Sequence, residues 1–242
     1  MSNSLDQAPP QQPKEDVAFD LEGAVEGAKV VLPIAAGVCT YGLVFGVLAQ
    51  QVGMSVLEVL LMSSLVFAGS SQLVVLSLWT MPLPIGAILL TTLIVNLRNL
   101  LMGVAVSPWF SQLSFFKKYA TLFFLSDESW ALTMGEFARG GRNAAFLLGC
   151  GLVLFVSWVG STVVGRMLGN VIHDPARWGL DFAFTAVFLV LLVALWKGKA
   201  DLLPWIIAAV VAVVAAHWLP GKWYILVGGL AGSIVGVVRH AE

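Results

Sequence analysis

Two adjacent carboxylates, Asp127 and Glu128, lie inside an apolar run that extends from Tyr119 to Met134 and holds no other charged residue. Acids inside the hydrocarbon core of a membrane are costly, and ionisable residues at that depth mark substrate pathways or proton relays. Because neighbouring residues diverge by about 100° around a helix, we expect one acid to be ion-paired and the other to face a cavity. The alternative is an interfacial hairpin that leaves both acids in water.

A second polar group interrupts the apolar run 56–79. It consists of Gly69, Ser70, Ser71 and Gln72, which suit a lipid-facing helix poorly. Irregular backbone is tolerated at that depth only where it is buried in protein or lines a wet cavity, and transporters use broken helices to direct backbone groups at a substrate. Two structures stay open: a broken or re-entrant segment, and a continuous helix whose serines bond to its own carbonyls.

A third group, in the run 85–106, contains Asn96, Arg98 and Asn99. The two asparagines share one face of a helix, whereas Arg98 points away from it. An arginine in the middle of a span needs an acidic partner, and the candidates are Asp127, Glu128 and Asp181. Alternatively, Arg98 lies near the interface and extends its charge into water. Asp181 opens a later run, either at the interface, where acids suit a helix start, or one turn deeper.

The elements that must position these groups are apolar segments of membrane-spanning length. Of the 242 residues, 59% are hydrophobic and only 11% charged, and the mean hydropathy is +0.90. Soluble domains carry about 25% charged residues, and the runs do not alternate as barrel strands do. We therefore predict an all-α polytopic integral membrane protein with about 7–8 membrane segments of ~20 residues, of which the second and fourth are broken or re-entrant.

The chain divides into a tail and a membrane part. Residues 1–18, rich in Pro, Gln and Asp, are predicted to be a disordered N-terminal tail, and residues 19–240 a single transmembrane transport domain. A short amphipathic helix at 19–29 is expected before the first span at 30–50, and no secretory signal peptide is expected. A topology with both termini in the cytoplasm fits the positive-inside rule. The fit improves if the second and fourth segments are re-entrant, because the lysines at 117–118 then lie on the cytoplasmic side.

Together the polar groups suit a zwitterion with an apolar side chain. Arg98 or backbone N–H groups would bind its carboxylate, and Asp127 or Glu128 its ammonium group. Aromatic walls would hold its side chain, with Phe67, Phe123 and Phe124 as candidates. A buried carboxylate could also exchange a proton. We therefore expect a secondary transporter coupled to protons, with a carrier or channel for another small solute as the alternative.

Other classes of function find little support in the sequence. The net charge of −1 points to no nucleic-acid partner. The chain lacks the HExxH, GxSxG and Walker motifs, and Ser70, Ser71 and His217 would have to meet from unrelated helices to form a nucleophile and base. Two isolated cysteines give no metal-binding spacing. We expect no enzyme, no cofactor and no metal site.

Four short motifs follow one another in order: FAGSSQ at 67–72, NLRN at 96–99, LSDE at 125–128 and LDFA at 180–183. They resemble the AzlC family, the large subunit of the branched-chain amino acid export permease. The resemblance covers about residues 21–238 and departs at Asn99, Met102 and Ser126, where the family often has His, Tyr and Thr.

That resemblance implies a multi-pass exporter of branched-chain or related apolar amino acids in the bacterial inner membrane. It also implies a small hydrophobic partner subunit of the AzlD type. The candidate substrate-binding or coupling residues come from the polar groups described above: Gly69, Ser70, Ser71, Gln72, Asn96, Arg98, Asn99, Asp127, Glu128 and Asp181.

Overall fold

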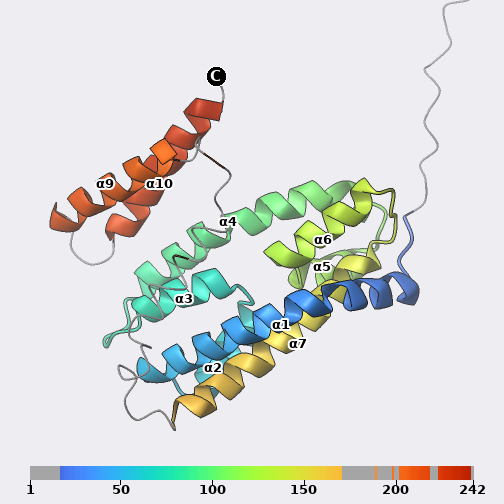
Figure 1. The fold of residues 1–242 in the computed structure, drawn as a ribbon, viewed down its shortest axis with the longest axis horizontal. Coiled ribbons are helices and arrows are strands. Elements are labelled where there is room, and N and C mark those ends of the chain that lie inside the picture. The colour runs from blue at the N-terminus through green and yellow to red at the C-terminus, as the bar shows by residue number, and fades with distance from the viewer. Residues whose placement is uncertain (1–16, 171–188, 190–197, 199–201, 219–222, 241–242) are drawn as a thin grey trace, which may run out of the picture. The chain divides into compact units, whose positions relative to one another are not determined.

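The computed structural model describes residues 17–170, 202–218 and 223–240, together with Leu189 and Gly198. Within this part the chain is helical, and its only β-type pairing is one isolated bridge between Ala18 and Asn143. In chain order (Figure 1) the helices are α1 Leu21–Gln51, α2 Val56–Leu65, α3 Gly69–Ser77, α4 Ile85–Phe110, α5 Phe115–Phe123, α6 Asp127–Ala138, α7 Ala145–Gly169, α9 Leu202–Trp218 and α10 Trp223–His240. The predicted all-α membrane fold is confirmed. The predicted tail lies almost wholly outside the described residues, and the single transport domain stays a prediction.

Among the described residues, three helices, α1, α4 and α7, are long and apolar enough to cross a membrane. They have 31, 26 and 25 residues, and a rise of 1.5 Å per residue makes the shortest of them about 38 Å long, more than the ~30 Å of a hydrocarbon core. The separate amphipathic helix expected at 19–29 is wrong as a boundary, because α1 runs without interruption from Leu21. A change from an amphipathic to an apolar sequence alters what the helix contacts, but it does not interrupt the helical hydrogen bonds.

The second and fourth apolar segments are broken, as predicted. Helices α2 and α3 have 10 and 9 residues, and α5 and α6 have 9 and 12. None of these is longer than about 18 Å, so none can cross the core alone. In the second segment the break falls at Phe67, whose φ of 42° no helix allows.

The described residues gather into two compact units, to which α1, α4 and α7 each contribute a part. Unit 1 comprises Met1–Thr40 and Arg98–Trp158, and unit 2 comprises Tyr41–Leu97 and Val159–Glu242. Each unit is described below by itself.

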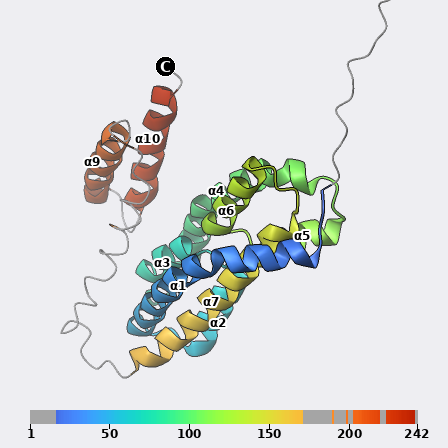
Figure 2. The same cartoon turned by 45° about the vertical axis from the view of Figure 1, so that its right-hand side comes forward.

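In unit 1 the first halves of α1 and α7 run parallel and side by side (Figure 2). Side chains other than hydrogen would not fit at two points of this seam, because a Cβ at Gly27 would collide with the Phe146 carbonyl and one at Gly149 with the Ala24 carbonyl. The helix starts are also joined, since the Asn143 amide donates to the Asp20 carboxylate over 2.7 Å. Parallel packing through small residues is typical of membrane helices.

Unit 1 also contains the α5–α6 segment, which turns back on itself. The rings of Trp109, near the end of α4, and Phe137, near the end of α6, stack with centroids 4.5 Å apart. Phe110 shares a buried cluster with Phe137 and with Ala144, just before α7. Because α5 also starts at the end of α4, the segment enters and leaves at the same end of unit 1. It is therefore a re-entrant hairpin.

In unit 2 the second halves of α1 and α7 continue the same parallel packing. Gly46 lies against the Thr162 carbonyl, and Gly165 against the Leu43 carbonyl. Arg166 donates from Nε to the Met54 carbonyl, so the loop after α1 is held to α7.

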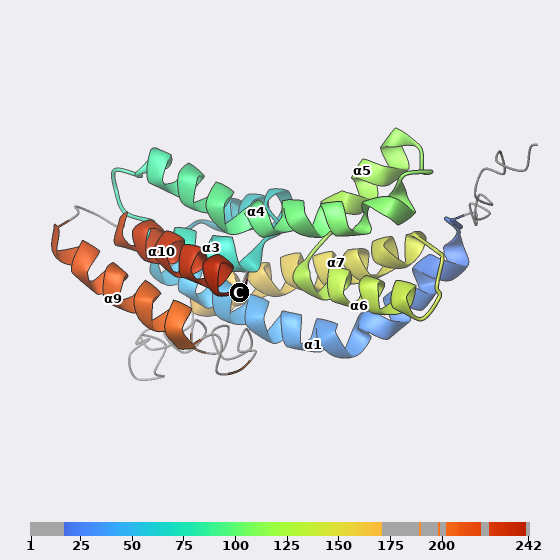
Figure 3. The same cartoon turned by 90° about the horizontal axis from the view of Figure 1, so that it is seen from above.

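Helices α9 and α10 form a close pair within unit 2 (Figure 3). A Cβ at Gly228 would collide with Ala212, and one at Gly232 with Ala208. Gly228 and Gly232 are four residues apart and share one face of α10. At these two positions α10 packs within the chain.

Candidate functional site

The break between α5 and α6 is set by two serines. Ser126 caps α6, accepting from the Ser129 backbone N–H over 3.3 Å, and the Ser126 N–H donates to Ser129 Oγ over 2.8 Å. Ser129 is fully buried, and its hydroxyl also donates to the Phe124 carbonyl over 3.3 Å. Such reciprocal caps satisfy donors that a helix start leaves open. The chain therefore turns at a fixed point, directly before the two acids.

An ion pair lies at this turn. Arg98 Nη1 is 2.9 Å from Asp127 Oδ2, and the two side chains are 40% and 49% exposed. The structure thus gives Arg98 one of the three partners that the sequence proposed. Because the pair is half-open rather than enclosed, its charges can be reached from outside unit 1.

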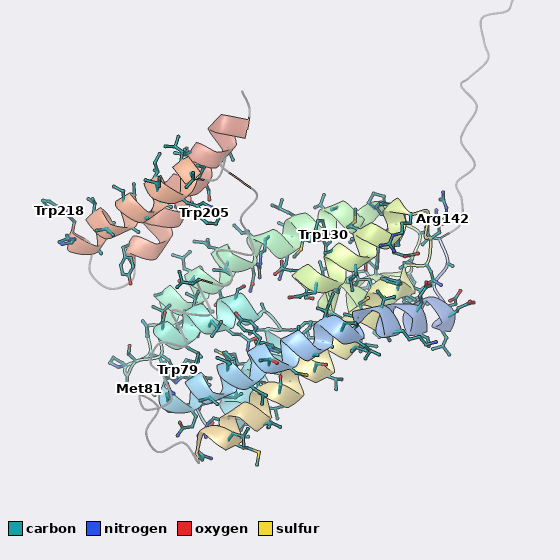
Figure 4. The ribbon with its side chains drawn as sticks, in the orientation of Figure 1. Trp79, Met81, Trp130, Arg142, Trp205 and Trp218 are labelled. Atoms are coloured by element: carbon teal, nitrogen blue, oxygen red, sulfur yellow. The ribbon has the colours of Figure 1, made fainter. Side chains whose placement is uncertain are left out.

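The depth of this pair follows from helix lengths. Arg98 lies about 12 residues from either end of α4, or about 18 Å along its axis, and half of a hydrocarbon core is about 15 Å. Asp127 is the first residue of α6, and α6 runs from there back toward the C-terminal end of α4 (Figures 1 and 4). Figure 4 labels Trp130 near the start of α6 and Arg142 beyond its end. Both charges therefore lie near the middle of the membrane if α4 spans it.

The remaining candidates of unit 1 surround the pair in sequence. Glu128 is half-buried and makes no ion pair with any described residue. Asn99 follows Arg98 on α4 and is also half-buried. The two acids do differ, since only Asp127 is paired, and an assignment of Glu128 to a cavity stays a prediction.

In unit 2 the polar run forms the start of α3. Gln72 closes the break, because its Oε1 accepts from the Ala68 N–H over 3.3 Å and its Nε2 donates to Ser63 Oγ over 3.2 Å. Ser71 Oγ donates to the Ala68 carbonyl over 2.9 Å. Ser71 and Gln72 are buried, whereas Gly69 is partly exposed. The broken segment, one of the two structures left open by the sequence, is the one observed.

No side chain caps the first turn of α3, because the residue at the cap position is Ala68. The backbone N–H groups at a helix start carry a partial positive charge, and helix starts at mid-membrane depth bind anionic substrate groups in transporters. The predicted binding run thus contains two kinds of residue. Ser71 and Gln72 hold the backbone, while Gly69 and Ser70 form the partly exposed start.

Two further candidates cannot be joined to these groups. Asn96 belongs to unit 2, and its buried Oδ1 has no hydrogen-bond partner among the described residues. Asp181 lies outside the described residues. Within the described part, no group of histidine, cysteine and acidic side chains could hold a metal ion.

The structure adds one residue that the sequence did not suggest. Phe155 on α7 contacts Phe124 edge-on with ring centroids 5.3 Å apart, and it also contacts Phe123 at 6.1 Å. Nothing in the apolar run of α7 distinguishes Phe155 from a residue that faces lipid. Only the position of the hairpin tip reveals it.

Comparison with known proteins identifies the family. Residues 33–172, more than half of the chain, match the family described as AzlC protein. The chain belongs to the AzlC family. It is 31% identical to an uncharacterized membrane protein of Archaeoglobus fulgidus over 176 residues, 72% of this chain and 76% of that one. This AzlC chain is a multi-pass membrane protein, as the long apolar helices require.

Two further relatives carry more informative names. The AzlC chain is 28% identical to the inner membrane protein YgaZ of Escherichia coli, over 88% of this chain and 87% of that protein. It is also 28% identical to the branched-chain amino acid transport protein AzlC of Bacillus subtilis, over 68% of this chain and 65% of that protein. No solved structure gives a significant match. The matched range 33–172 includes both helix breaks and the Arg98–Asp127 pair.

Proposed function

We propose that the chain is the large subunit of a secondary transporter that exports branched-chain or related apolar amino acids across the inner membrane in exchange for protons. A small hydrophobic membrane subunit of the AzlD type would complete it. The name of the Bacillus subtilis relative supports the substrate class, and that of the Escherichia coli relative supports the membrane.

The observation that carries this proposal is the half-open ion pair at the α5–α6 break. A zwitterionic amino acid presents one charge for each partner, so its carboxylate binds Arg98 while its ammonium group binds Asp127. The 2.9 Å contact must open to admit it. Charges at this depth need partners because water is absent. When the substrate separates Arg98 from Asp127, its carboxylate and its ammonium group replace the partner that each side chain loses.

Proton coupling follows from competition at one carboxylate. A proton on Asp127 neutralises the group that holds the ammonium, so proton binding and substrate binding exclude each other. That relation gives exchange rather than co-transport, and an inward proton gradient then drives the amino acid outward. Glu128, which has no ion pair within the described residues, offers a second carboxylate nearby.

The half-exposed aromatic rings at the break account for the apolar side chain of the substrate. Phe123 is 46% exposed, and Phe124 lies three positions before Asp127. We also assign Gly69 and Ser70, at the start of α3 in unit 2, to substrate binding.

Exchange assays in sealed vesicles test this proposal. We expect counterflow of leucine, valine and methionine that requires the small subunit and responds to an imposed pH gradient. Asp127→Asn should reduce the rate of proton-driven exchange more than tenfold. The loss of a substrate contact worth only ~1.4 kcal/mol already lowers the affinity tenfold. Glu136→Gln, an acid at the outer end of α6, should leave exchange within about twofold of the wild type, because exposed ion pairs are worth little.

Two results would reject the mechanism. Undiminished transport in both Asp127→Asn and Glu128→Gln would remove the acids from it. Flux without counterflow would indicate a channel instead of a carrier. Transport of a different solute with none of the three amino acids would reject the substrate class alone.

A further inference from the structure

We infer that Phe155, on α7, determines the size of the amino-acid side chain that the transporter accepts. The inference rests on the proposed function and goes beyond it, because it assigns substrate selectivity to one residue outside the polar motifs. Phe155 belongs to unit 1, as do the hairpin tip and the ion pair.

Three aromatic rings form one cluster at the hairpin tip. Phe123 and Phe124 contact each other at right angles with centroids 5.1 Å apart, and Phe155 contacts both. Phe124 and Phe155 are half-buried and Phe123 is exposed. The cluster therefore presents an apolar surface rather than filling a closed core. Edge-to-face aromatic packing gives such a surface a defined shape.

The cluster is fixed to the charged groups by backbone contacts. The Phe124 carbonyl accepts from Ser129 Oγ, and Ser129 caps the helix that starts with Asp127. On the other side, the Phe124 carbonyl lies directly against Gly151, where any Cβ would collide with it. The tip thus rests on α7, one turn before Phe155.

This arrangement fits an apolar α-amino acid. The two charged groups of the substrate lie on the Cα, and its side chain extends from the same atom. A substrate bound at Asp127 therefore projects its side chain within a few ångströms of the ion pair. Phe123 and Phe124 are carried by the hairpin itself, whereas Phe155 stands on the long helix behind it. The Phe155 ring consequently sets how far the side chain can extend, which favours branched aliphatic over aromatic substrates.

Opposite changes of volume at Phe155 test the assignment. In sealed vesicles holding the full chain and its small subunit, we expect Phe155→Ala to raise the ratio of phenylalanine to leucine exchange rates about tenfold, the usual scale of size discrimination in an apolar site. Phe155→Trp should lower the ratio of leucine to valine exchange severalfold. Val156→Ala, one residue further and 68% exposed, should change neither ratio.

The readout is a ratio of rates within each variant, so a loss of folded protein alone does not produce it. If Phe155→Ala does not accumulate in the membrane, Phe155→Leu supplies the same test with an intermediate shift. Wild-type exchange of leucine combined with unchanged ratios in all Phe155 variants would overturn the inference and leave the proposed function intact. Absence of amino-acid exchange by the wild type would instead overturn the proposed function.

Discussion

The coupling between Arg98 and Asp127 is the quantity that the structure predicts most directly. A charged side chain at the centre of a span costs roughly 2.5–3.5 kcal/mol. Because the two side chains are 40% and 49% exposed, we take a cost somewhat below this range, about 2 kcal/mol, for a charge left without its partner. Arg98→Gln and Asp127→Asn should each lower the free energy of unfolding by about that much.

The double variant removes both charges and leaves neither without a partner. Its loss should therefore be clearly smaller than the two single losses combined, with a coupling energy of about 2 kcal/mol in a double-mutant cycle. Reversible unfolding in mixed micelles measures all four proteins. Tryptophan fluorescence serves as the signal, since the chain contains 9 tryptophans.

The pair formed by Arg139 and Glu136 provides the matched control. It joins an arginine to a carboxylate over 3.5 Å near the end of α6, at a spacing of three residues, and the side chains of Arg139 and Glu136 are 79% and 26% exposed. Exposed pairs contribute about 0–1 kcal/mol, so its cycle should give less than about 0.5 kcal/mol. Equal coupling energies for the two pairs would refute the deep location of Arg98 and Asp127, and with it the argument for a substrate site there.

Three further outcomes are expected. Gly27→Ala drives a Cβ into the backbone of α7 and should destabilise the protein by about 1–3 kcal/mol, as measured by thermal unfolding. Gly160→Ala, with open space around it, should leave the stability unchanged. Equal effects of the two substitutions would contradict the close packing of α1 against α7. Hydrogen bonds from the Gly23 N–H and the Asn143 amide hold the pKa of Asp20 below its ordinary 3.8, so its stabilising effect is complete above that pH and is lost as the pH falls below it; the acid limb of an unfolding-versus-pH curve should flatten in Asp20→Asn. Single cysteines at Lys118 and Arg142, with the two native cysteines replaced by alanine, should react with an impermeant reagent from the same side of the membrane; opposite sides would refute the re-entrant α5–α6 hairpin.

Much of the fold could be predicted from the sequence because its signals are local. Long apolar runs identify α1, α4 and α7, and small polar residues inside an apolar run identify the two breaks. The acid-arginine pairing was also accessible, since an arginine in the middle of a span needs a nearby acid.

Other features depend on contacts between distant segments. The re-entrant path of α5–α6 depends on the stacking of Trp109 on Phe137, which no local pattern indicates. The polarity of the sequence changes near residue 30 and so predicts a separate helix at 19–29, but helical hydrogen bonding does not require constant polarity, and α1 continues through this point. Phe155 matters only because Gly151, one turn earlier, lets the hairpin tip approach α7.

The two breaks share a hydrogen-bond pattern and differ in charge. In each, a buried serine at the third helical position donates to the carbonyl of the cap residue, Ser71 to Ala68 over 2.9 Å and Ser129 to Ser126 over 3.2 Å. After the shared pattern, α3 starts with uncharged residues, and α6 starts with two acids. A donor-rich neutral helix start attracts an anionic group, and an acidic one attracts a cation. The shared pattern fixes the backbone at each break, and only the α6 start adds charge. Neutral replacements of Asp127 and Glu128 should therefore impair transport far more than substitutions at the α3 start.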